Sequence, residues 1–317
     1  MPVLRESSFT GCLLGGACGD ALGQPIEAFP PDRLHAEFGE IRDFMPGDPR
    51  LPMPLGAGQW TDDTQMTLDI ARSIIRCGKL DPADVAREFV REHETEGIRF
   101  SGHTIKYSLI RLRRGVPWDQ SGMDDDWTQS NGAAMRIAAV GLLACLRLDR
   151  LPEDVRLASM ITHKHPEAIA GARAVAFMVT RAAAGTLDPA TLIAETIDLV
   201  GECDVVANLR KAEGLLSEEI TTRAALKKLG TTPYIVHTTA AAAYCFLKTP
   251  HDLERTVIDA VMGGNDADTT GAIAGAISGA FNGEEAIPTR WRDHVERGQE
   301  IRGMAQALFR IVNGEGG

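Results

Sequence analysis

Oxygen-bearing side chains are grouped at two places in the chain, and each group lies directly before an apolar segment. The first group is Thr61, Asp62 and Asp63, and the second is Asp266, Asp268 and Thr269. Carboxylates and hydroxyls packed this closely are the ligands that hard divalent cations such as Mg²⁺ and Mn²⁺ prefer. The same residue types also cap helices, so each group alone fits a cap or a cation site. Because the pattern occurs twice, we expect a metal centre built from both groups, with Thr270 as the alternative ligand to Thr269.

Glycines spaced four residues apart mark helices next to these groups. They are Gly11, Gly15, Gly19 and Gly23 near the start of the chain and Gly271, Gly275, Gly279 and Gly283 after the second acidic group. On a helix this spacing forms one flat stripe, which another backbone can approach closely. Each interior glycine costs a helix about 0.5–1 kcal/mol relative to alanine, so the stripes require a packing role. We expect both helices in the core, where the two stripes could face each other, and we expect Gly23 and Pro25 to end the first helix.

The rest of the chain is dominated by helical periodicity. Met66, Ile70, Ile74 and Cys77 form one apolar face that ends before Gly78. Residues 29–58 contain six prolines without periodicity, which indicates an irregular connection that forms a lid or a wall. The segment SNGAAMRIAAVGLLACLRL predicts an apolar helix capped by its first polar residues. No alternating strand pattern is present, so we predict an all-α fold, a single compact multi-helix domain over residues 1–317.

Charge and composition exclude several classes of protein. The formal net charge of −11 argues against a protein held on nucleic acid or on an anionic membrane by general electrostatics. No segment reaches the roughly 18 consecutive apolar residues that a membrane-spanning helix needs. The six cysteines stand singly, without the spacing of a zinc site, which is typical of reduced cytosolic proteins. We expect a soluble, cytoplasmic protein with no nucleic-acid partner and no membrane span.

Five segments carry a family pattern when they are taken together. In chain order they read GCLLGGACGDALGQPIE, QWTDDTQM, SNGAAMRIAAVG, THKHPEAIAGA and NDADTTGAIAGAISGA. The sequence resembles the ADP-ribosylglycohydrolases, including the bacterial dinitrogenase reductase-activating glycohydrolases, over residues 11–280. The resemblance implies an all-α domain with two Mg²⁺ or Mn²⁺ ions in a central cleft. It also implies removal of ADP-ribose from a modified protein side chain, with ADP-ribosyl-arginine as the first choice. For the mechanism, we hypothesise that a metal-activated water attacks the anomeric carbon.

The resemblance also implies roles for residues at matching positions. The implied metal ligands are Thr61, Asp62, Asp63, Asp266, Asp268 and Thr269. The implied catalytic carboxylates are Glu27, Asp62 and Asp63, and the sequence leaves open which of them positions or deprotonates the water. The implied ADP-ribose contacts are Gly102, Ser130, Asn131, Gly132, Arg136 and His163. The segment GIRFSGHT departs from the family's glycine-rich diphosphate loop, because only Gly97 and Gly102 are glycines in it.

Two of these positions have simpler explanations in the sequence alone. Arg136 has apolar neighbours, so its guanidinium must either reach solvent or be held by a carboxylate or a phosphate. His163 is equally well explained as a surface histidine.

The proposed acidic site is consistent with bound cations on charge alone. Its five carboxylates carry a formal charge of −5, which two divalent cations would reduce to about −1. We expect an ADP-ribosylated protein as substrate, ADP-ribose as product, and a monomeric enzyme. The alternatives are a hydrolase of serine-linked or small-molecule ADP-ribose conjugates, a two-metal phosphoesterase acting on the same ligand, and a non-catalytic ADP-ribose-binding protein on this scaffold.

Overall fold

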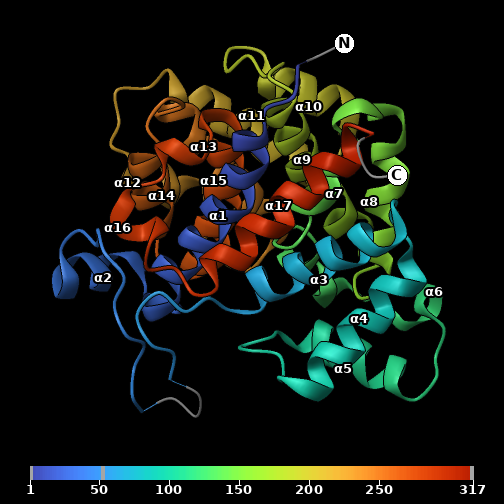
Figure 1. The fold of residues 1–317 in the computed structure, drawn as a ribbon. Coiled ribbons are helices and arrows are strands. Elements are labelled where there is room, and N and C mark those ends of the chain that lie inside the picture. Colours follow the sequence, from blue (N-terminus) through green and yellow to red (C-terminus); the bar gives the residue numbers. More distant parts are fainter. Residues whose placement is uncertain (1–2, 51–53, 315–317) are drawn as a thin grey trace.

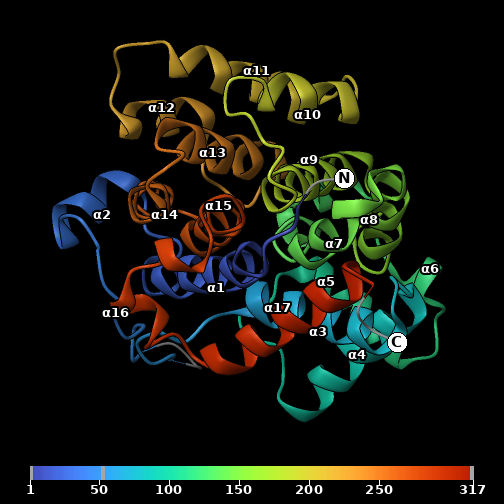
Figure 2. The ribbon, with the colours of Figure 1, turned by 45° about the horizontal axis from the view of Figure 1, so that its top comes forward.

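Two long helices form the centre of the molecule. The computed structural model describes residues 3–50 and 54–314, and helix α1 (Glu6–Gly23) lies beside helix α15 (Ala267–Asn282) in both views (Figure 1 and Figure 2). Both helices are buried along nearly their whole length. Within the described ranges no strand forms, and the predicted all-α fold is confirmed.

The glycine stripes of α1 and α15 face each other and form what we call the glycine seam. Its three opposed pairs are Gly11 with Gly279, Gly15 with Gly275 and Gly19 with Gly271. Residue numbers rise on one helix as they fall on the other, so the helices are antiparallel. A Cβ atom on Gly15 would lie 2.5 Å from the Gly275 carbonyl oxygen. This distance is too short for any side chain at position 15. The predicted packing role of the stripes is therefore confirmed, and the backbones themselves are in contact.

Helix α1 ends at Gly23, as predicted, but Gly23 does not have the left-handed conformation of a glycine that terminates a helix. Its φ of −80° is helical, and the chain continues into the 3₁₀ turn η1 (Gln24–Ile26), which holds Pro25 in its first turn. The reason for a glycine here is space, because a Cβ atom on Gly23 would lie 2.4 Å from the Asp268 backbone nitrogen. By contrast, Gly283, the last glycine of the second stripe, follows α15 with a φ of +88°.

The remaining helices enclose this central pair. Helix α17 (Gly298–Val312) packs against α1 and against α3 (Asp62–Cys77), while α9 (Pro166–Ala183), α13 (Ile235–Lys248) and α14 (Leu253–Val261) pack against α15. The other helices are α2 (Pro31–Phe38), α4 (Pro82–Thr95), α5 (His103–Arg113), α6 (Trp118–Ser121), α7 (Ala138–Leu143), α8 (Leu151–Met160), α10 (Leu192–Val200), α11 (Asp204–Leu216), α12 (Thr222–Leu229) and α16 (Thr289–Arg292). In the part of the chain that is described, no helix is both long enough and apolar enough to cross a bilayer.

Two segments differ from the helix boundaries expected from sequence. The proline-rich connection over residues 29–58 contains α2, because Pro31 suits a first helical turn and Leu34 is buried beneath it; residues 51–53 lie outside the described residues. The apolar segment after Ser130 is not one helix, since a 3₁₀ turn at Asn131–Ala133 precedes the short α7. Its start is held instead by the neighbouring chain, where the Asn131 N–H donates to the Pro233 carbonyl at 3.0 Å.

The glycine seam predicts a large cost for a single methyl group. In Gly275→Ala the new Cβ would lie 2.2 Å from the Gly15 carbonyl oxygen, so the two helices must separate. We expect the free energy of unfolding, measured by urea titration, to fall by about 2 kcal/mol or more. The matched control is Gly214→Ala in α11, where the new Cβ meets nothing within 4 Å and the gain should be about 0.5–1 kcal/mol. Equal effects of the two substitutions would contradict the seam.

Candidate active site

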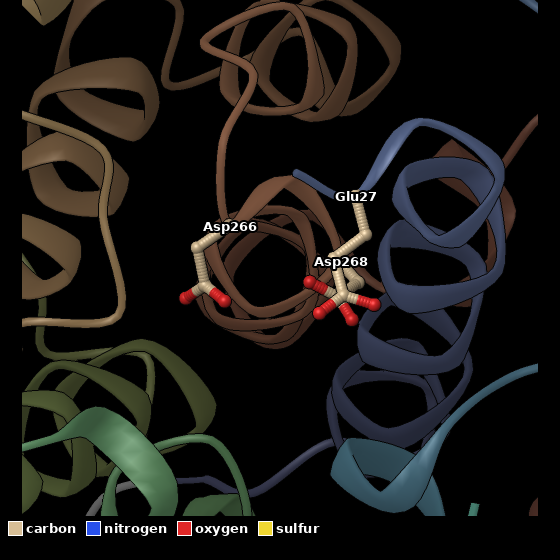
Figure 3. A group of neighbouring side chains, drawn as sticks. All are labelled: Glu27, Asp266 and Asp268. Carbon is tan, nitrogen blue, oxygen red and sulfur yellow. The ribbon is translucent and has the colours of Figure 1, made fainter. Parts of the chain in front are cut away.

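The antiparallel register of the glycine seam brings two acidic segments together. Glu27 follows the end of α1 by four residues, and Asp266 and Asp268 lie at the start of α15, which Gly23 contacts. Glu27, Asp266 and Asp268 each offer a carboxylate oxygen, and these atoms all lie within 4.8 Å of one another. Figure 3 shows the three carboxylates pointing to the same side of the two chain segments. Residues nearly 240 positions apart in sequence thus form one acidic cluster.

The backbone at this junction is strained and doubly hydrogen-bonded. Ala28 and Asn265 have φ angles of +67° and +56°, in the left-handed region that non-glycine residues avoid. The Ala28 N–H donates to the Asn265 carbonyl at 2.6 Å, and the Asn265 N–H donates to the Phe29 carbonyl at 2.7 Å. These bonds hold the residue after Glu27 and the residue before Asp266 in fixed conformations. The backbone next to Glu27 and next to Asp266 therefore fixes the direction of these two side chains.

The second predicted group lies at the start of α3 and is held by a carboxylate from α1. Thr61 is the N-cap, and its hydroxyl accepts a hydrogen bond from the Asp63 N–H at 3.3 Å. The fully buried Asp20 accepts hydrogen bonds from the Thr61 N–H at 3.0 Å and from the Thr64 hydroxyl at 2.6 Å. Sequence analysis did not assign Asp20 a role. Its signal was present, because Asp20 is the one charged residue inside an otherwise uncharged glycine-striped helix after Glu6.

Burial and mutual repulsion make these carboxylates weak acids. Burial raises the pKa of Glu27 to about 7, with further contributions from Asp266 and Asp20. Burial likewise raises the pKa values of Asp20 and Asp266 to about 6, against the opposing effect of their hydrogen bonds. The pKa values of Asp62, Asp63 and Asp268 are raised well above the ordinary range by burial and by neighbouring carboxylates. A group of this kind needs positive charge if all its members are to ionise at neutral pH.

The residues present fit a bound divalent cation. The donors are carboxylate and hydroxyl oxygens, which suit a hard cation. Asp63 Oδ2 is buried and accepts no hydrogen bond, and such an orphaned oxygen is costly unless it has a ligand. The cluster can therefore bind a metal ion. A bound ion would give the orphaned Asp63 oxygen a partner, and it would also lower the raised pKa values of the carboxylates.

The acidic cluster forms the floor of a cavity of about 300 Å³. Most of the predicted site residues line it, namely Glu27, Asp62, Asp63, Asp266, Asp268, Thr269, Gly102, Ser130, Asn131, Gly132 and His163. The wall also contains residues that sequence analysis did not name: Phe100, His103, Thr104, Ile105, Trp127, Met135 and Pro233. Phe100, His103 and Thr104 belong to the segment GIRFSGHT that the resemblance had marked, whereas only their position in the fold identifies the other four.

Two predicted residues do not line the cavity. Thr61 is fully buried at its cap position, and Arg136 is fully buried beneath the cavity wall. Neither explanation offered for Arg136 holds for the described residues, because its guanidinium reaches neither solvent nor a carboxylate. It stacks over the Phe89 ring at 5.0 Å and donates to the Thr162 hydroxyl at 2.6 Å. Burial also lowers the pKa of Arg136 to about 9.

Three smaller questions are answered by side-chain positions. The Thr270 hydroxyl donates to the Asp266 carbonyl at 2.9 Å, whereas Thr269 lines the cavity. The interpretation of His163 as a surface histidine is wrong, since its ring is fully buried. Asn131 donates through its amide to the Asp266 carboxylate and to the Thr238 hydroxyl, the latter at 2.9 Å, so it links the cavity wall to the acidic cluster.

Comparison with known proteins identifies similar chains over nearly the full length. The family model described as ADP-ribosylglycohydrolase matches residues 1–316. An uncharacterized protein of Archaeoglobus fulgidus is 33% identical over 96% of this chain and 97% of its own. The ADP-ribosylarginine hydrolase Tri1 of Serratia proteamaculans is 29% identical over 94% of this chain and 78% of its own. A solved structure titled ADP-ribosylglycohydrolase-related protein complex is 30% identical, with a TM-score of 0.79 over 97% of this chain and 99% of its own.

The raised pKa values predict that the metal-free protein loses stability as the pH rises. Between about pH 4 and pH 7, Asp20, Glu27 and Asp266 hold protons in the folded state that they release in the unfolded state. Folding therefore binds protons, and the free energy of unfolding falls with increasing pH across this window. After chelation we expect urea unfolding to show a lower free energy at pH 8 than at pH 5, and Mn²⁺ should restore more stability at pH 8.

A variant of Glu27 separates the contribution of the acidic cluster to the pH dependence of stability from that of the other titrating groups. In Glu27→Gln the loss between pH 5 and pH 8 should shrink, because one of the repelling charges is absent. Asp149→Asn, which changes an exposed carboxylate in a surface turn, should show the full wild-type loss. An unchanged pH dependence in Glu27→Gln would show that the cluster does not titrate in this range.

Proposed function

This chain belongs to the ADP-ribosylglycohydrolase family, and on that premise we propose that it removes ADP-ribose from ADP-ribosylated arginine side chains of proteins. Family membership makes it a hydrolase of ADP-ribosylated substrates. The arginine linkage is supported by the similarity to Tri1, whose name describes an ADP-ribosylarginine hydrolase. Serine-linked and small-molecule conjugates of ADP-ribose are the alternative substrates of the same chemistry.

The acidic cluster at the floor of the cavity carries this proposal. Three carboxylates from two chain segments, Glu27, Asp266 and Asp268, converge within 4.8 Å in the lining of the cavity. Asp62, Asp63 and Thr269 line the same cavity, and Thr61 caps the helix that carries the two aspartates. We assign these residues to two Mg²⁺ or Mn²⁺ ions, which when bound would offset the carboxylate charge and lower the pKa of a water molecule.

Glu27 is our choice for the carboxylate that positions and deprotonates the attacking water. Its carboxylate lines the cavity and lies within 4.8 Å of those of Asp266 and Asp268, so it can reach a water molecule held at the cluster. Asp62 and Asp63 are the alternatives, and the buried Asp63 Oδ2, which accepts no hydrogen bond, makes Asp63 better suited to hold a cation. Cleavage of the bond at the anomeric carbon passes through an oxocarbenium-like transition state, which nearby carboxylates stabilise electrostatically.

The cavity wall accommodates the rest of ADP-ribose in this proposal. Ser130, Asn131, Gly132, His163 and Gly102 lie along it and would contact the ribose and diphosphate. We further propose that residues 1–317 act as one ADP-ribosylglycohydrolase-like domain, as a monomer in the cytoplasm. A non-catalytic ADP-ribose-binding protein on this scaffold is the alternative of another class, and turnover separates the two.

The proposal predicts metal-dependent release of free ADP-ribose. With Mg²⁺ or Mn²⁺ present, we expect faster hydrolysis of arginine-linked than of serine-linked ADP-ribosyl peptides, with ADP-ribose identified by mass spectrometry. Asp62→Asn and Asp268→Asn should each lower kcat/KM by about 100-fold or more, because each removes a buried carboxylate that lines the cavity. Asp149→Asn serves as the matched control and should retain wild-type activity.

Three outcomes would count against the proposal. Release of AMP would indicate diphosphate cleavage, and thus a phosphoesterase. Binding of ADP-ribose without turnover at saturating metal would indicate a binding protein. Wild-type activity in both aspartate variants would remove the acidic cluster from the reaction.

A further inference from the structure

We propose that Thr162 and Arg136 are positioning residues, which act through the His163 imidazole to make the Ser130 hydroxyl a hydrogen-bond donor toward the diphosphate of ADP-ribose. This inference rests on the proposed function for its ligand. Its structural basis is a continuous chain of hydrogen bonds that runs from a buried cation to the cavity wall. We call this chain of four side chains the Arg136–Ser130 relay.

Three contacts make up the relay. Arg136 Nη2 donates to Thr162 Oγ1 at 2.6 Å. Thr162 Oγ1 lies 2.8 Å from His163 Nδ1, and His163 Nε2 lies 2.9 Å from Ser130 Oγ. Arg136 and Thr162 are fully buried away from the cavity, whereas the buried His163 ring and Ser130 both line it.

The direction of each proton follows from the first contact. The guanidinium can only donate, so one lone pair of Thr162 Oγ1 is used and its own hydrogen must find an acceptor. Among the described residues that acceptor is His163 Nδ1, because the Thr162 hydroxyl has no other partner. The imidazole then carries its proton on Nε2 and donates to Ser130 Oγ. The Ser130 hydrogen is left free to point into the cavity.

The electrostatic surroundings keep the imidazole neutral, as this arrangement requires. Burial and the neighbouring Arg136 charge hold the pKa of His163 well below its ordinary value. The other groups in contact with the guanidinium are the Phe89 ring, the Met66 sulfur and the Ala158 carbonyl, none of which carries a negative charge. The carboxylates of Asp62 and Asp69 act on it without contact and oppose the effect of burial on its pKa. With no charged partner in contact, Arg136 polarises the hydroxyl that it binds.

The surrounding backbone is shaped to allow the relay. A Cβ atom on Gly132 would lie 2.6 Å from His163 Cε1, so any other residue there would displace the ring from Ser130. The Thr162 carbonyl accepts from the Met123 N–H at 3.0 Å and from the Ser108 hydroxyl at 3.2 Å, which fixes the residue in place.

The relay has a function because the cavity contains no permanently charged donor. Among the described residues neither lysine nor arginine lines it, and His103 and His163 are its only basic side chains. Hydroxyl and amide donors therefore matter for binding the diphosphate, and a hydroxyl whose hydrogen has a fixed direction binds an anion better than a freely rotating one. Through the relay, the buried Arg136 guanidinium orients the Ser130 hydroxyl at the cavity wall. The guanidinium itself contacts neither solvent nor substrate.

The decisive variant is Thr162→Val, which removes the hydroxyl with little change of volume. We expect the Kd for ADP-ribose and the KM to rise about tenfold, while kcat changes by less than about threefold. Ser130→Ala should weaken binding to a similar extent, and the double variant should be no weaker than Ser130→Ala alone because both act through one hydroxyl. Thr162→Ser should restore wild-type binding.

A matched control separates this role from general stability. Thr180→Val also removes a buried threonine hydroxyl, but one that bonds to the Gly141 and Ala176 carbonyls away from the cavity. It should lower the unfolding temperature without changing the Kd. Equal changes of Kd in the two valine variants, or additive losses in the double variant, would overturn the relay.

A measurement on the ligand-free protein keeps this inference distinct from the proposed function. Long-range proton–nitrogen NMR reports which ring nitrogen of each histidine carries the proton, and loss of one signal in His163→Gln assigns His163 among the eight histidines. We expect protonation on Nε2 in the wild type and a mixture of tautomers in Thr162→Val. Protonation on Nδ1 in the wild type would exclude the relay. Failure to bind or hydrolyse any ADP-ribose conjugate would instead refute the proposed function and leave this tautomer result standing.

Discussion

The contact between two bare backbones along the glycine seam determines how the rest of this protein is arranged. Ordinary helices pack through side chains that can repack by sliding or changing rotamer. Here Gly15 and Gly275 leave no side chain to adjust, and the carbonyl oxygens of one helix lie where Cβ atoms would otherwise lie on the other. The register of α1 against α15 is therefore fixed to within a fraction of a residue. The residues at the ends of these helices, including Glu27 and Asp266, are therefore held at fixed positions relative to each other.

The acidic cluster depends on this rigidity because it is unfavourable by itself. Carboxylates such as Glu27, Asp63 and Asp268 lose hydration and repel one another when they are buried together. A flexible scaffold would let them separate, whereas the seam and the strained junction at Ala28 and Asn265 hold them together. The glycine seam thus holds the carboxylates in an arrangement whose repulsion can be relieved by protonation or by a bound cation.

Local patterns in the sequence predicted the parts of the structure that local forces decide. The four-residue glycine spacing predicted a close helix contact, and the face from Met66 to Ile74 predicted α3 with its end at Gly78. The two groups of aspartates and threonines could also be recognised, because the members of each group are neighbours in the sequence. What could not be predicted depends on contacts distant in sequence: Asp20 holding the start of α3, the burial of His163, and the position of Arg136 beneath the cavity. The end of α1 was predicted at the right residue, but the reason for its glycine is the close approach of the Asp268 backbone, which the sequence does not show.

The separation of α1 and α15 along the chain has a consequence for how the protein is made. The two halves of the seam lie near opposite ends of the sequence, so α1 leaves the ribosome long before α15 has been synthesised. Until then its apolar, glycine-rich surface has no partner, and loop closure over more than 200 residues must precede the final packing step. The acidic cluster therefore cannot assemble on a nascent chain. A chain released before residue 266 lacks Asp266 and Asp268, two of the three carboxylates that converge within 4.8 Å.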